Sequence, residues 1–274
     1  MKNILLTIEY DGTEFCGWQR QPDQRSVQGE VESVLSKICG QPIQINGTSR
    51  TDAGVHAYGQ RANFLAEFSI PTEKIPLVAN GMFAAAASDK GKGRKTAGDI
   101  VILKAEEVSE AFHARFQAIG KKYIYKINNS PLPDPFLRNY SYQIGKTLDM
   151  DAMMQAANHL IGTHDFKCFQ AAGGKELEST VRTIYGAKLI KPYKGTGQKD
   201  IQLEITGDGF LYNMVRIITG TLVDIGLGRK NPNDLIKIIE SKDRQLAGHT
   251  APPQGLYLQE VYYEKERLLE AVKQ

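Results

Sequence analysis

The sequence predicts an α+β fold made of two similar halves, because strand and helix patterns follow one another in the same order twice. Short segments with apolar residues at every second position are typical of strands, and longer segments with helical spacing lie between them. In each half the order is β-α-β-β-α-β, which is typical of a ferredoxin-like domain. We therefore predict two ferredoxin-like halves, residues 1–111 and 112–274, that build a central antiparallel sheet and leave a cleft where they meet.

The first half begins with a strand over Asn3–Tyr10, in which apolar residues alternate. A helix follows, since Ser26 can cap its start, apolar residues recur at helical spacing and Gly40 lies just past its end. The remaining elements predicted for this half are a short strand near Gln41–Asn46, a strand through Ala57–Phe68, a helix over Thr72–Ala87 whose first turn is limited by Pro76, and a strand over Asp99–Val108.

The second half begins with a strand over Lys121–Asn128, which places Tyr123, Tyr125 and Ile127 on one face. The same two spacings predict its other elements. These are a helix over Leu148–Ile161, strands over Val181–Lys191 and Asp200–Thr206, a helix over Leu211–Gly226, a short helix after Pro232, a strand over Gly255–Tyr263 and a terminal helix over Glu264–Gln274.

The composition is that of a globular protein with a mildly basic balance of charge. The 274 residues are 41% hydrophobic and 24% charged, and the formal net charge is +3, which permits an RNA or phosphate partner without requiring one. Three scattered cysteines and five histidines without metal-ligand spacing predict neither a disulfide framework nor a metal site. No segment reaches the roughly 18 apolar residues of a membrane helix, and the first segment reads as a strand instead of a signal peptide, so we expect a cytoplasmic protein.

Two irregular segments interrupt the alternation of strands and helices. Ser88–Asp99 places four cations among glycines, and it is either a solvated loop or an arm that contacts phosphate. Lys191–Asp200 is most simply a connection within a hairpin.

The triplet Asp11-Gly12-Thr13 after the first strand resembles part of the DxDGT nucleophile motif of haloacid-dehalogenase-type phosphatases. That chemistry requires an aspartate at the position of Glu9. A tight turn explains Asp11 and Gly12 on backbone grounds alone. A magnesium-dependent phosphatase is therefore a rival hypothesis that Glu9 disfavours.

A charged loop over Asn46–Gln60, "NGTSRTDAGVHAYGQ", is too polar for a strand and too rich in glycine for a helix. It places Arg50, Thr51 and Asp52 side by side, with Arg61 just beyond. These charges form either a surface ion-pair cluster, which contributes about 0–1 kcal/mol, or a site where chemistry is done. The residues of this loop alone leave both readings open.

Five segments, in order along the chain, resemble the tRNA pseudouridine synthase A family. The most specific is "SRTDAGVHAYGQ" from Ser49, which is similar to the signature loop of that family. The other four begin at Asp11 ("DGTEFCGWQRQPDQRSVQGEVESVL"), Phe112 ("FHARFQAIGKKYIYKI"), Gly207 ("GDGFLYNMVRIITGTLVDIG") and Gly248 ("GHTAPPQGLYLQEVYY"). The resemblance therefore covers nearly the whole chain.

The resemblance implies an isomerase that needs no cofactor. It would convert uridine to pseudouridine in the anticodon stem-loop of tRNA, at positions 38, 39 and 40. Members of the family have two ferredoxin-like halves in a pseudouridine synthase fold, and they are typically homodimers that bind tRNA across both subunits. A non-catalytic RNA-binding protein on the same scaffold is the alternative, which the presence of Asp52, Tyr123 and Arg216 together disfavours.

Site roles follow from the resemblance, residue by residue. Asp52 matches the catalytic carboxylate, and Arg216 matches its arginine partner, which can hold a carboxylate in a bidentate pair. Tyr123 matches the tyrosine that packs against the target base, and Leu256 matches an apolar residue at the floor of the pocket. Arg50 matches the arginine that fills the space left when the base turns out of the stack.

Other residues have weaker assignments. Arg20, Lys121 and Lys122 are generic candidates for contacts with the RNA backbone. The family commonly has Gly-Ala-Gly before Arg-Thr-Asp, whereas Thr48 and Ser49 stand here, so their hydroxyls can change the hydrogen bonds of the loop. His56 and His113 lie inside motifs, and we expect them to satisfy backbone groups instead of taking part in catalysis.

Overall fold

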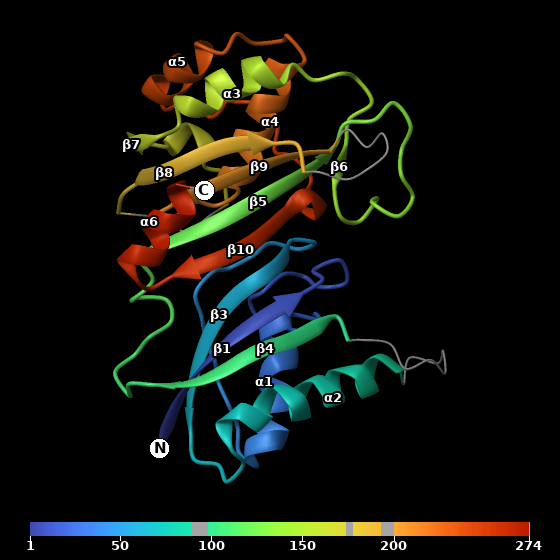
Figure 1. Ribbon diagram of the computed structural model, residues 1–274, viewed down its shortest axis with the longest axis vertical. Coiled ribbons are helices and arrows are strands. Elements are labelled where there is room, and N and C mark those ends of the chain that lie inside the picture. The colour runs from blue at the N-terminus through green and yellow to red at the C-terminus, as the bar shows by residue number, and fades with distance from the viewer. Residues whose placement is uncertain (89–97, 174–177, 193–199, 274) are drawn as a thin grey trace. The chain divides into compact units, whose positions relative to one another are not determined.

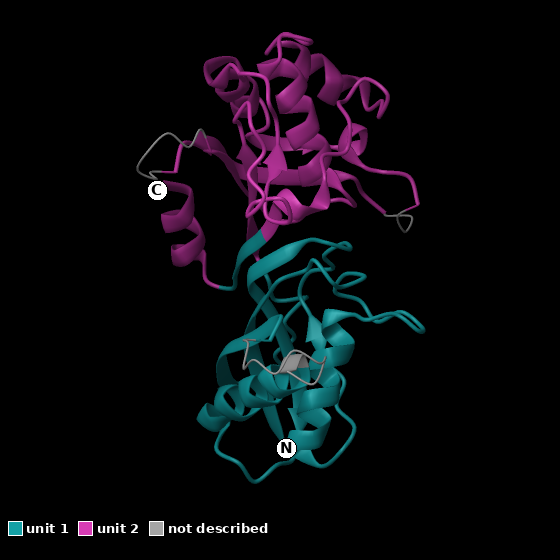
Figure 2. Cartoon of the chain, turned by 90° about the vertical axis from the view of Figure 1, so that its right-hand side faces the viewer, with its two compact units in different colours: residues 1–118, 258–263 teal, residues 119–257, 264–274 magenta. Residues whose placement is uncertain are grey.

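The structure is a computed structural model that describes residues 1–88, 98–173, 178–192 and 200–273. It confirms the α+β class, with mostly antiparallel strands (Figure 1). The chain divides into two compact units, one of residues 1–118 and 258–263 and the other of residues 119–257 and 264–274 (Figure 2). The division into domains at residues 1–111 and 112–274 remains a prediction, because compactness alone does not show that a segment folds separately.

In the first unit, strand β1 (Lys2–Tyr10) lies between β3 (His56–Ala66) and β4 (Ile100–Val108) and is antiparallel to both. The final strand β10 (Leu256–Tyr262) adds its residues 258–262 to this unit beside β3. Ile4, Leu6 and Ile8 of β1 are fully buried, as the predicted alternation of apolar residues requires. The segment Asn46–Gln60, which we judged too polar for a strand, is a loop only in its middle, because Asn46–Gly47 pair with β3 and His56–Gln60 belong to β3.

Helix α1 (Val27–Cys39) has the predicted caps. The Ser26 hydroxyl accepts a hydrogen bond from the Gly29 N–H, and Gly40 closes the helix with a left-handed φ of 66°. Helix α2 (Ile75–Ser88) follows a 3-10 turn, η1 (Thr72–Lys74). Pro76 has no N–H to donate to the Thr72 carbonyl, so the α-helical hydrogen bonds do not extend into this turn.

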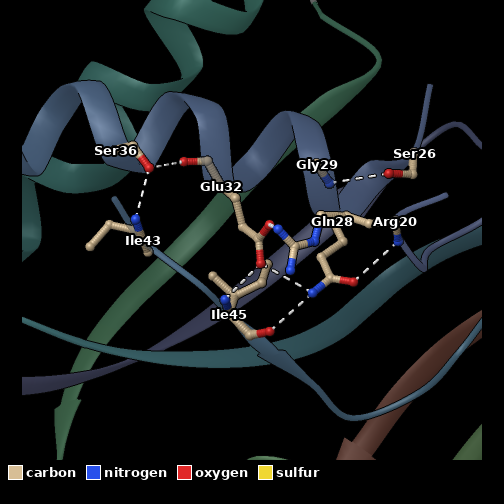
Figure 3. Close-up of polar contacts among 8 residues, drawn as sticks. All are labelled: Arg20, Ser26, Gln28, Gly29, Glu32, Ser36, Ile43 and Ile45. Carbon is tan, nitrogen blue, oxygen red and sulfur yellow. Dashed lines mark hydrogen bonds and ion pairs between the residues drawn. The ribbon is translucent and has the colours of Figure 1, made fainter. Parts of the chain in front are cut away.

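The strand predicted near Gln41–Asn46 is wrong in extent, since only β2 (Asn46–Gly47) pairs with β3. The reason lies in side chains of α1. The Ile43 N–H donates to Ser36 Oγ, and the Ile45 N–H donates to the Glu32 carboxylate, both at 2.9 Å (Figure 3). These donors are satisfied by a helix instead of a neighbouring strand.

In the second unit, four strands lie in the antiparallel order β5 (Gly120–Asn128), β9 (Asp200–Gly207), β8 (Val181–Ile190) and β7 (Gly162–Asp165). A short strand, β6 (Tyr142–Gln143), pairs in parallel with β5. We did not predict β6 and β7, because two and four residues are too few to show a period. The first strand of each half was predicted to within a residue at each end.

The helices of the second unit are α3 (Met150–Asn158), α4 (Met214–Gly226), α5 (Asp234–Ser241) and α6 (Lys265–Lys273). Helix α4 packs on α3 and on β5, and α3 packs on β8. Helix α4 begins three residues later than predicted, because Asn213 has a left-handed φ of 60°. This start matters for Arg216, which lies in the first turn.

Within the described residues, no helix has the length and apolar character needed to cross a membrane. Most of the segment Ser88–Asp99 lies outside the described residues, as does most of Lys191–Asp200. The interpretations of these two segments therefore remain predictions.

Candidate active site

The backbone of the loop that carries Asp52 is held by the segment between β1 and α1. The Trp18 N–H donates to the Thr51 carbonyl at 3.0 Å, and Gly17 forms an isolated antiparallel bridge with Asp52. Gly17 has a φ of +112°, and a Cβ there would lie 2.6 Å from the Thr51 carbonyl oxygen. Both facts require glycine, so the aspartate is placed by a close backbone contact that tolerates no side chain.

Side chains reinforce this contact from β1. The hydroxyls of Tyr10 and Thr51 share a buried hydrogen bond of 2.7 Å, and the rings of Tyr10 and Trp18 are 6.1 Å apart. Both aromatic side chains are at most 3% exposed, whereas Asp52 is partly exposed. The backbone that carries the Asp52 carboxylate is therefore fixed by contacts with two buried aromatic side chains.

The triplet at the end of β1 forms the turn that we predicted. Asp11 Oδ1 accepts hydrogen bonds from the Thr13 N–H at 3.0 Å and the Thr13 hydroxyl at 2.6 Å. His56 Nδ1 accepts from the Gly12 N–H at 3.0 Å, and Asp11 Oδ1 lies 3.1 Å from the same nitrogen. His113 Nδ1 likewise accepts from the Arg115 N–H at 3.2 Å. Both histidines satisfy backbone groups, as we expected.

The arginines around the loop do not form a surface ion-pair cluster with Asp52. Arg61 donates to Thr7 and pairs with Glu106 at 3.2 Å, and its side chain is only 19% exposed. Arg50 is exposed and makes no hydrogen bond or ion pair with any residue that the structure describes. Arg50 is thus available to a partner from outside, whereas Arg61 supports the sheet.

Thr48 and Ser49, which depart from the family pattern, are both built into the first unit. Thr48 Oγ1 lies 3.0 Å from the carbonyl oxygens of Arg61 and Ala114 and from the Tyr263 hydroxyl. Gln60 accepts from the Ser49 N–H at 3.2 Å and donates to its carbonyl at 2.7 Å. The added hydroxyl of Thr48 therefore forms hydrogen bonds that fix the start of the loop.

In the second unit, the guanidinium of Arg216 is held at the start of α4. Its Nε donates to the Ala251 carbonyl at 2.8 Å, and its Nη1 donates to Asn213 Oδ1 at 2.6 Å. The Ala251 N–H in turn donates to the Arg216 carbonyl at 3.1 Å. A cation among apolar neighbours needs such partners, and here two of them are uncharged oxygens.

Tyr125 and Tyr123 lie on one face of β5 but have different surroundings. Tyr125 is fully buried, its hydroxyl donates to the Pro252 carbonyl at 2.6 Å, and burial raises its pKa far above the usual range. The Tyr123 ring meets Phe210 edge to face at 5.1 Å. Tyr125 is structural, and it ties β5 to the segment that ends at the buried Leu256.

Residues 251–256 thus lie next to two of the predicted site residues of the second unit. Ala251 accepts a hydrogen bond from Arg216, and Leu256 is the last residue of the segment. Tyr123 lies two positions before Tyr125, which bonds to Pro252. Asp52 and Arg50 belong to the first unit, so a pair between Asp52 and Arg216 remains a prediction. Sequence reasoning missed Tyr10, Gly17, Trp18, Asn213 and Phe210, which position these residues. Their contacts join segments distant in sequence, apart from Asn213, three residues before Arg216.

Another two observations bear on possible ligands. Lys122 pairs with Glu204 at 2.7 Å and is 16% exposed, which argues against a contact with RNA. Within the part of the chain that the structure describes, no three or more histidine, cysteine, aspartate or glutamate residues are grouped as metal ligands would be.

Comparison with known proteins gives a consistent result. A family model described as tRNA pseudouridine synthase matches residues 6–117 and 156–264. Arg50, Asp52, Arg216 and Leu256 fall inside these ranges, and Tyr123 falls outside them.

Curated relatives are similar over almost their whole length. The "tRNA pseudouridine synthase A 2" of Clostridium tetani is 44% identical over 96% of this chain and 99% of its own. The "tRNA pseudouridine synthase A" of Caldicellulosiruptor saccharolyticus is 46% identical over 96% of this chain and 100% of its own, and that of Acetivibrio thermocellus is 43% identical with the same coverage.

Proposed function

Because the chain belongs to the tRNA pseudouridine synthase family, we propose that it isomerises uridine to pseudouridine in the anticodon stem-loop of tRNA, at positions 38, 39 and 40. The observation that carries this proposal is the Asp52 loop. Its one partly exposed carboxylate extends from a backbone that Gly17, Trp18 and Tyr10 hold in place. Placing a reactive group on a rigid support is a general requirement of catalysis.

The reaction explains why one carboxylate suffices. The bond between ribose C1′ and uracil N1 breaks, the base turns, and a bond forms between C1′ and uracil C5. A proton leaves C5, and N1 takes up one proton. Atoms and electrons balance within the nucleoside, so the net change needs no oxidant, reductant or group donor. In our proposal Asp52 either attacks the substrate or stabilises the charge that develops on it.

We assign Arg216 the role of holding the Asp52 carboxylate. A guanidinium forms bidentate pairs with carboxylates, and the hydrogen bonds to Ala251 and Asn213 limit the orientations that it can take. Such a pair would keep the carboxylate ionised.

We assign Tyr123 and Leu256 to the pocket for the target base. Tyr123 would pack against the base and is the candidate for removing the proton from C5, and Leu256 would form the floor. Arg50, whose side chain is exposed, would fill the space left by the base and hold a phosphate. We further propose that the protein is cytoplasmic and that it forms a homodimer, which binds tRNA across both subunits.

The experiment that tests the substrate uses tRNA transcripts labelled with tritium at uracil C5, in buffer with EDTA. Pseudouridine formation releases this label into water. We expect release from a transcript with uridine at positions 38 to 40, and none from a matched transcript that carries cytidine there. Equal release from both transcripts would contradict the assigned positions, and no release from several tRNAs would favour a non-catalytic RNA-binding protein.

A further inference from the structure

A buried carboxylate lies on α1, the helix that follows the segment bracing the Asp52 loop. Glu32 of α1 is 5% exposed. Its Oε1 accepts hydrogen bonds from the Ile45 N–H at 2.9 Å and from Gln28 Nε2 at 3.1 Å, and its Oε2 lies 3.1 Å from Arg20 Nη1 (Figure 3). All these residues belong to the first unit.

Arg20 is held at two points and is still half exposed. Its backbone N–H donates to Gln28 Oε1 at 3.3 Å, while Glu32 holds one end of its guanidinium. The Arg20 side chain is 51% exposed. A guanidinium has five N–H donors, so one ion pair through Nη1 leaves donors for a ligand on the exposed side.

Two other arginines of the same unit show what a structural arginine looks like here. Arg25 lies between two acids, Glu30 at 3.0 Å and Asp99 at 2.7 Å, and its guanidinium stacks 4.1 Å from the Phe15 ring centre. Its side chain is 29% exposed, and that of Arg61 is 19% exposed. Arg20 has one acidic partner, as Arg61 has, but its side chain is 51% exposed, which is well above both.

The segment that carries Arg20 is the one that braces the Asp52 loop. The Gln28 N–H donates to the Trp18 carbonyl at 3.0 Å, and the Trp18 N–H donates to the Thr51 carbonyl at the same distance. Arg20 follows Trp18 by two residues, a span of at most about 7 Å in an extended chain. The backbone of Arg20 therefore lies close to the residue that braces the loop.

We propose that Arg20 binds a phosphodiester of the tRNA strand beside the target nucleotide, and that Glu32 is its positioning residue. An arginine side chain loses rotamer entropy when it is fixed, and Glu32 removes part of this cost before the RNA binds. The inference rests on the proposed function, because it takes tRNA as the ligand.

The test measures tRNA affinity at several salt concentrations for wild type, Arg20→Ala, Glu32→Gln and the double variant. Arg20→Ala is expected to weaken binding roughly tenfold and to reduce the slope of log K against log salt by about 1, as the loss of one phosphate contact should. The KM for tRNA rises with it, while kcat at saturating tRNA stays unchanged. Lys37→Ala, which removes an exposed cation from the last turn of α1, is the charge-matched control and leaves the slope unchanged.

Glu32→Gln gives an outcome opposite in sign to a simple charge effect. The substitution removes a negative charge, which by itself would strengthen RNA binding. If Glu32 positions Arg20, the Glu32→Gln single variant should bind tRNA more weakly than wild type. The same substitution should have no further effect when Arg20 is already alanine. Thermal melting of each variant separates this effect from unfolding.

An Arg20→Ala variant with unchanged affinity and salt slope overturns the inference and leaves Glu32 with a purely structural role. Tighter binding by Glu32→Gln overturns the positioning role alone. Wild type that binds tRNA but releases no tritium would contradict the proposed function, and the salt slopes would still decide whether Arg20 contacts phosphate.

Discussion

The loop around Asp52 and the start of α4 around Arg216 both present a charged side chain, but they position it differently. In the first, the backbone is fixed by Gly17 and Trp18, and the side chain of Asp52 extends from it. In the second, the guanidinium itself is held by the Ala251 carbonyl and the Asn213 amide. The short aspartate is placed by its backbone, whereas the long arginine needs hydrogen bonds at its end.

The largest effect short of removing a site residue should come from breaking the backbone contact in the first region. Gly17→Ala puts a Cβ 2.6 Å from the Thr51 carbonyl and strains a φ of +112°, so the Asp52 loop must move. We expect kcat to fall on the order of 100-fold, since a displacement near 1 Å can have that effect. Single-turnover tritium release measures it.

Gly40→Ala is the matched control for Gly17→Ala. Gly40 also has a positive φ, of 66°, but a Cβ there meets nothing within 4 Å. It should lose about 1 kcal/mol of stability and no activity. A similar loss of kcat in both variants would mean that strain in general, and not the contact with the loop, limits the reaction.

A smaller effect is expected from the second region, where the hydrogen bond between Arg216 and Asn213 can be removed. Asn213→Gly keeps the left-handed backbone and deletes the amide that accepts from Arg216 Nη1. We expect kcat to fall roughly tenfold, as for one hydrogen bond to a charged group. Asn213→Asp, which restores an acceptor, should recover most of the loss. Full activity of Asn213→Gly would show that the hydrogen bond to Asn213 is not needed to position Arg216.

The smallest effect on activity should come from Tyr125→Phe, which sharpens the contrast with Tyr123. The change leaves the Pro252 carbonyl without its 2.6 Å hydrogen bond, so the free energy of unfolding should fall by about 1–2 kcal/mol with kcat nearly unchanged. Tyr123→Phe should reduce kcat, because Tyr123 is the residue that we assign to the target base. Denaturant titration and tritium release on both variants make the comparison. Equal kcat losses would remove the distinction between them.

Local signals in the sequence predicted the elements whose structure is decided locally. Ser26 and Gly40 mark the ends of α1 because capping depends on neighbouring residues. The segment before β2 was not predictable, because Glu32 and Ser36 of α1 satisfy its backbone donors from a distance. The late start of α4 is likewise set by one residue, Asn213, whose backbone conformation has no period to reveal it.

The candidate site divides in the same way. Arg50 and Asp52 stand out because a resemblance marks their loop, and Arg216 because a cation among apolar residues needs partners. What fixes these residues did not stand out. Gly17 and Trp18 contact the loop across more than thirty positions of sequence, and Ala251 reaches Arg216 across 35. Only the folded chain brings such segments together.

The central claim is that Asp52 carries the reaction, and Asp52→Asn tests it most directly. Tritium release from C5-labelled tRNA is measured beside tRNA affinity, with Glu14→Gln, an exposed carboxylate in the segment that braces the loop, as the matched control. We expect Asp52→Asn to bind tRNA with nearly wild-type affinity and release no label, while Glu14→Gln releases it at the wild-type rate. Substantial release by Asp52→Asn would contradict the assignment of the active site.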